Sequence, residues 1–86
     1  MKLNLQVTYN DGTAKDITCN AADFVAFEDK YNVSIGTLGT ETKLSYLLFL
    51  AWNSERRTGA TKDTFELWLE DVASVGDSGV DPKSKG

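Results

Sequence analysis

The start of the chain alternates apolar and polar side chains, and this alternation sets the strongest constraint on the fold. The apolar members are Leu3, Leu5, Val7 and Tyr9. Apolar residues at every second position are typical of a strand with one buried face. Residues 10–12, Asn-Asp-Gly, follow at once and tolerate the positive φ of a tight hairpin turn. We therefore predict a return strand over 13–19, with Ile17 and Cys19 facing inward and Lys15 at the rim.

A two-stranded hairpin is barely stable alone, so helices must cover its apolar face. The first helix is predicted over 21–31. Asn20 is a good N-cap residue, Asp23 carries negative charge into the first turn, and Asn32 can end the helix. Its apolar stripe consists of Phe24, Phe27 and Tyr31. The spacing of these rings is that of one helix face.

The second helix is predicted to open at Thr40 or Glu41, after a glycine-containing loop over 34–39. It ends at the basic pair Arg56-Arg57 before Gly59, which is a helix-stop signal. Residues 44–52 are apolar nearly all round the helix. Such a helix takes a central, buried position or presents an exposed face to a partner.

The third helix is predicted over 64–74, opened by Asp63 and Glu66 at capping-box spacing. Its amphipathic stripe consists of Phe65, Trp68, Leu69, Val72 and Val75. From Gly76 the sequence loses its periodicity, so we expect residues 76–86 to form a flexible tail. The predicted fold is α+β: a single domain over 1–75, with an N-terminal β-hairpin packed on a three-helix unit in the order ββααα.

Composition argues against catalysis and against nucleic-acid binding. The 86 residues include no histidine and one cysteine, Cys19. The chain therefore lacks the commonest general base and most zinc sites, and no phosphate-binding or dinucleotide motif is present. We expect no enzyme activity, no metal and no cofactor. Nine basic against thirteen acidic residues give a net charge of −4, which disfavours contact with a phosphate backbone.

The same residues favour a cytoplasmic protein. The longest apolar run, 46–52, is much shorter than the roughly 20 residues that span a bilayer. The alternating start lacks the apolar region of a signal peptide, and a lone cysteine suits a reducing compartment. We expect no membrane contact and a role in binding other proteins.

Residues 46–75 carry a family resemblance. Its elements are Tyr-Leu at 46–47, Ala-Trp at 51–52, Arg-Arg-Thr-Gly at 56–59, Thr-Phe-Glu-Leu-Trp-Leu at 64–69, and Val72. This arrangement resembles the small tail assembly chaperones of long-tailed bacteriophages. In that family an apolar helix ends in a basic pair and a glycine, and a helix opening with Thr-Phe follows a short polar loop. The Phe-Glu pair at 27–28 is also similar.

The resemblance implies a viral protein of the host cytoplasm that coats the apolar, helical tape-measure protein and helps to recruit the tail-tube subunit. The residues proposed to contact proteins are Phe49, Trp52, Arg56, Arg57, Phe65 and Trp68. A homo-oligomer is also compatible with the sequence. Two alternatives remain open: a structural virion component, such as a connector or tail-tip subunit, and a small acidic inhibitor of a host protein.

Overall fold

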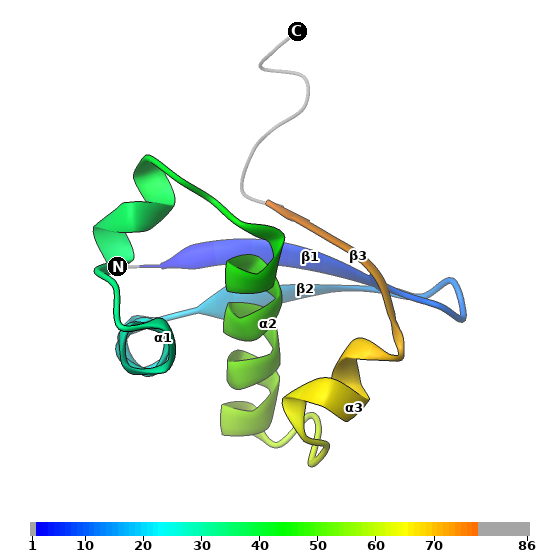
Figure 1. The fold of residues 1–86 in the computed structure, drawn as a ribbon. Helices are drawn as coiled ribbons and strands as arrows, with labels where there is room; N and C mark the ends of the chain where they lie inside the picture. The colour runs from blue at the N-terminus through cyan, green and yellow to red at the C-terminus, as the bar shows by residue number, and fades with distance from the viewer. Residues whose placement is uncertain (1, 78–86) are drawn as a thin grey trace, which may run out of the picture.

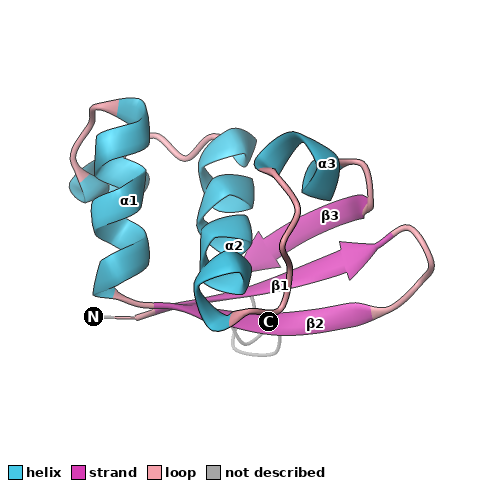
Figure 2. Cartoon of the chain, turned by 90° about the horizontal axis from the view of Figure 1, so that it is seen from below, coloured by secondary structure: helices cyan, strands magenta, loops and turns pink. Residues whose placement is uncertain are grey.

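The computed structural model describes residues 2–77 and has an α+β fold (Figure 1). The strands are β1 (Leu3–Tyr9), β2 (Ala14–Cys19) and β3 (Val72–Asp77), and the helices are α1 (Ala21–Tyr31), the 3-10 helix η1 (Ile35–Gly39), α2 (Leu44–Thr58) and α3 (Phe65–Leu69). The strands form one antiparallel sheet in the order β2-β1-β3. Figure 2 shows α1, α2 and α3 on the same face of this sheet. The α+β class predicted from the sequence is thus confirmed.

The N-terminal hairpin forms as its residue pattern predicts. Leu5 lies opposite Ile17 in the β1–β2 register. The turn contains Gly12 at a φ of 92°, and the Asp11 carboxylate accepts hydrogen bonds from the amide and hydroxyl of Thr13 at 2.9 and 2.7 Å. Ile17 and Cys19 are buried as predicted. The hairpin therefore presents an apolar face to the helices.

The first helix has the predicted bounds, and its caps explain them. The Asn20 side chain accepts from the Ala22 amide, and Asp23 accepts from the Asn20 amide. Asn32 ends the helix in the left-handed region at a φ of 55°.

The second helix ends before Gly59 as predicted, but it begins at Leu44 rather than at residue 40 or 41. The segment before it is held to η1 instead: the Thr42 hydroxyl donates a hydrogen bond of 2.6 Å to the Leu38 carbonyl.

The C-terminal part differs from the prediction. The helix predicted over 64–74 ends at Leu69, and its N-cap is Thr64 rather than Asp63. Residues 72–77 instead form β3, with Val75 opposite Val7 of β1. Val72 and Val75 are β-branched and favour a strand here, Gly76 disfavours continuation of the helix, and β1 offers an open edge to pair with. The predicted order ββααα therefore lacks a final strand.

The domain consequently extends to Asp77, two residues beyond the predicted boundary at 75. Gly76 and Asp77, assigned from the sequence to the tail, belong to β3. The remaining tail residues, 78–86, lie outside the described residues.

The core lies between the sheet and α2. Figure 1 shows α2 crossing the middle of the sheet, with α1 on one side and α3 on the other. The buried apolar residues are Leu5, Val7, Ile17, Cys19, Phe24, Phe27, Tyr46, Phe49, Leu50, Ala51 and Trp68. Of the two positions expected for the apolar second helix, the central one is observed, and its C-terminal half lies beside α3.

Candidate protein-binding surface

Four aromatic rings connect α2 with α3. They belong to Phe49, Trp52, Phe65 and Trp68, and we call them the α2–α3 aromatic cluster. The ring centroids of Phe49 and Trp52 are 5.6 Å apart, and those of Trp52 and Phe65 are 5.5 Å apart. Phe65 stacks on Trp68 at 6.4 Å. Contacts at these separations stabilise beyond simple area burial, so the cluster fixes α3 against α2.

Two rings of the cluster are buried, and the other two are partly exposed. Phe49 and Trp68 are 5% and 2% exposed and belong to the core. Trp52 and Phe65 are half-buried and reach the surface. Of the four aromatic residues proposed from the sequence, Trp52 and Phe65 are therefore accessible, while Phe49 and Trp68 support them from beneath.

The two adjacent arginines point to different places. The Arg56 guanidinium lies 5.7 Å from the Trp52 ring and donates to the Asp63 carbonyl at 3.2 Å. Trp52 donates to the same carbonyl at 3.0 Å, so Arg56 belongs to the rim of the aromatic cluster. Arg57 instead forms an ion pair of 2.9 Å with Asp23 of α1. The structure therefore separates Arg57 from the other proposed contact residues.

Leu67 is an accessible apolar residue that sequence reasoning missed. It lies on α3 between Phe65 and Trp68 and is 54% exposed. It falls outside the apolar stripe of that segment, so the periodicity that located the helix gave it no role. The signal that could have identified it is an apolar residue at a helix position outside the buried stripe. Residues two apart on a helix point in different directions, so Leu67 lies on another side of α3 than Phe65. The accessible part of the aromatic cluster therefore consists of Trp52 and Phe65, which we call the α2–α3 surface, with Arg56 at its rim.

Trp68 also lines a polar cavity of about 550 Å³, which lies between the hairpin turn and the loop that follows α2. The buried Glu55 carboxylate lines this cavity. Tyr9 donates to this carboxylate at 2.6 Å, Trp68 at 3.1 Å, and the Lys15 ammonium lies 2.7 Å away. Burial raises the pKa of the Tyr9 phenol, and the hydrogen bond to Glu55 adds to that rise.

The environment of Glu55 makes it a structural anion rather than a proton acceptor. Burial alone would raise its pKa, but the hydrogen bonds from Lys15, Tyr9 and Trp68 together hold the pKa below its usual value. Among the described residues, no group of three or more Asp, Glu, Cys or His side chains could hold a metal ion. The cavity therefore offers polar walls around an anion that already has three partners, Tyr9, Trp68 and Lys15.

No protein-family model, curated protein or solved structure matches the chain. Within residues 2–77, no helix is both long and apolar enough to cross a membrane.

Proposed function

We propose that the protein is a tail assembly chaperone that binds an apolar helical client through the α2–α3 surface. The main observation behind this proposal is that the rings of Trp52 and Phe65, 5.5 Å apart, are only half-buried and reach the surface. Apolar side chains gathered on a rigid support are the usual anchor for an amphipathic helix. The client in this proposal is the tape-measure protein, with the tail-tube subunit as a second partner.

Two further features support this assignment. Arg56 borders the rings and keeps donors for a client carboxylate or carbonyl, because guanidinium groups carry five N–H donors. The net charge of −4 would help to keep a complex with an apolar client in solution. Phe49 and Trp68 hold the exposed rings in place, so little side-chain entropy would be lost on binding.

The test is co-expression with the tape-measure product of the same genome. The wild-type protein should bring this product into the soluble fraction and co-purify with it. Phe65→Ala should weaken the retained complex by about tenfold or more, since it removes a central apolar contact. Val25→Ala is the matched control, because Val25 is 58% exposed on α1 and lies outside the α2–α3 surface.

Circular dichroism should show that both variants keep the wild-type fold. Equal retention of the client by Phe65→Ala and Val25→Ala would exclude the α2–α3 surface as the contact. An insoluble client, together with the protein in purified mature particles, would favour the structural virion component instead.

A further inference from the structure

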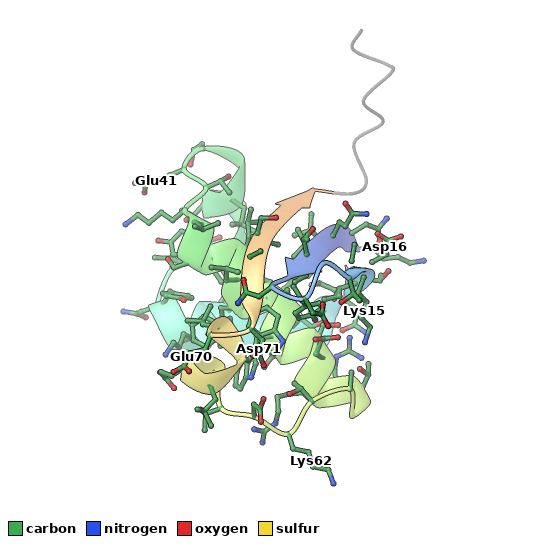
Figure 3. The ribbon with its side chains drawn as sticks, turned by 90° about the vertical axis from the view of Figure 1, so that its right-hand side faces the viewer. Lys15, Asp16, Glu41, Lys62, Glu70 and Asp71 are labelled. Carbon is green, nitrogen blue, oxygen red and sulfur yellow. The ribbon has the colours of Figure 1, made fainter. Side chains whose placement is uncertain are left out.

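The two edges of the sheet differ in how they are protected. β1 is central, so β2 and β3 form the edges of the described sheet. The β2 edge carries the adjacent charges Lys15 and Asp16, which discourage pairing with another strand. β3 reads Val-Ala-Ser-Val-Gly from 72 to 76 and carries no charge there. Figure 3 shows β3 facing the viewer on this side of the molecule.

An apolar groove of about 160 Å³ runs beside this edge, between β3 and the start of α2. Leu48 and Val75 form part of its lining, and Leu44 at its rim is 62% exposed. A strand added to β3 would direct every second side chain toward the groove, because side chains alternate across a strand. The edge supplies main-chain pairing and the groove supplies side-chain contacts.

Acidic side chains border this edge. Glu70 and Asp71 immediately precede β3, and Asp71 also lines the polar cavity. Figure 3 shows Glu70 and Asp71 near the start of β3 and Glu41 farther from the strand, beside the loop before α2. Lys43 lies 5.7 Å from the ring of Tyr46, which packs against α1 residues. A second copy of this chain paired in parallel would bring its own Glu70 and Asp71 beside these two, so like charges disfavour that arrangement. A segment with basic ends is the complementary occupant.

We propose that β3 adds an extended segment of a partner protein, with apolar side chains at alternate positions in the groove and Lys or Arg at its ends. Main-chain hydrogen bonds would supply affinity and the groove would supply side-chain selection. The proposal does not depend on the chaperone assignment, because it uses other residues than the α2–α3 surface.

The probe is a synthetic peptide, Lys-Val-Thr-Val-Thr-Val-Lys, titrated into the isotopically labelled full chain. We expect its binding to shift the backbone amide resonances of β3 rather than those of β2. A peptide with glutamate in place of both lysines should bind about tenfold more weakly, a difference of about 1.4 kcal/mol. Ala73→Lys should weaken binding of the basic peptide, because it places a like charge at the groove.

Ala14→Lys is the matched control, since Ala14 is an exposed alanine on the opposite edge strand. Shifts confined to β2, or equal binding of the two peptides, would overturn the proposal. A dimer mass in sedimentation without peptide, accompanied by concentration-dependent shifts in β3, would assign the edge to a second copy and overturn it as well.

Discussion

The phenol of Tyr9 donates a hydrogen bond of 2.6 Å to the Glu55 carboxylate, although 46 residues separate the two along the chain. Tyr9 ends β1 and Glu55 lies in α2. The same carboxylate accepts from Trp68 of α3 and pairs with Lys15 of β2. One buried anion therefore joins four elements of the fold, and its satisfied hydrogen bonds offset the cost of its burial.

Removing the phenol hydroxyl should destabilise the protein measurably. Tyr9→Phe leaves Glu55 with one donor fewer, so we expect the free energy of unfolding to fall by about 1–2 kcal/mol. Tyr31→Phe is the matched control. The Tyr31 hydroxyl donates to the Ser45 carbonyl at 3.2 Å in an exposed setting, and its loss should cost less than about 0.5 kcal/mol. Urea unfolding measures both, and equal losses would contradict the role assigned to Glu55.

Acid should destabilise the protein partly through Glu55. The pKa of this group is lower in the folded protein than its ordinary value of about 4.3. Its contribution is therefore fully present above that ordinary value and is lost as pH falls through the folded pKa. Glu55→Gln should start from lower stability at neutral pH and lose less of it between about pH 5 and pH 3.

The measurement is the urea midpoint as a function of pH, with Glu66→Gln as a control at an exposed helix position. The pKa of Asp11 is also lowered, by its hydrogen bonds from Thr13, but Asp11 is unchanged in every variant and cancels in the comparison. Parallel pH profiles for wild type and Glu55→Gln would show that Glu55 does not contribute to the acid transition.

Turn and capping residues in the sequence were sufficient to predict the first half of the fold. The turn at Gly12 and the caps Asn20 and Asn32 act on backbone atoms within a few residues. Such residues specify a boundary wherever the segment is placed, and the hairpin and α1 follow the prediction for that reason.

The second half depends on contacts that sequence spacing does not reveal. Val72 and Val75 continue the spacing of Phe65 and Trp68, so a longer helix was the direct interpretation. They pair with β1 instead, which lies more than half of the chain away in sequence. This strand pairing decides the structure of the segment against its helical spacing of apolar residues. Glu55 was equally unremarkable as a glutamate near a helix end, because its three partners come from distant segments.

The Asp23–Arg57 pair should show an asymmetric response to substitution. The Asp23 side chain is fully buried and also accepts from Asn53 at 2.8 Å. Arg57→Ala would leave this carboxylate buried without its cation, so we expect a loss of about 3 kcal/mol, which is the lower end for breaking a buried pair because Arg57 is partly exposed. Asp23→Ala should cost a similar amount, since it removes the charge and its hydrogen bonds.

The double variant separates pairing from simple truncation. If the two groups act on each other, Asp23→Ala combined with Arg57→Ala should cost clearly less than the sum of the single losses. Lys30→Ala combined with Asp23→Ala provides the additive reference, because Lys30 lies over the Phe65 ring instead. Additive losses in both double variants would show that the ion pair contributes no coupling.

Cys19 should report opening of the core. Burial, with the nearby Asp23 charge as a second cause, raises the pKa of its thiol to about 12, and the sulfur contacts the Leu50 carbonyl at 3.4 Å. At pH 8 the folded protein should therefore react with an aromatic disulfide reagent about a thousandfold more slowly than the unfolded chain. Urea should restore the rate along the unfolding transition. Val25→Cys in a Cys19→Ala background supplies an exposed thiol for comparison, and equal native rates for the two thiols would show that Cys19 is accessible without opening.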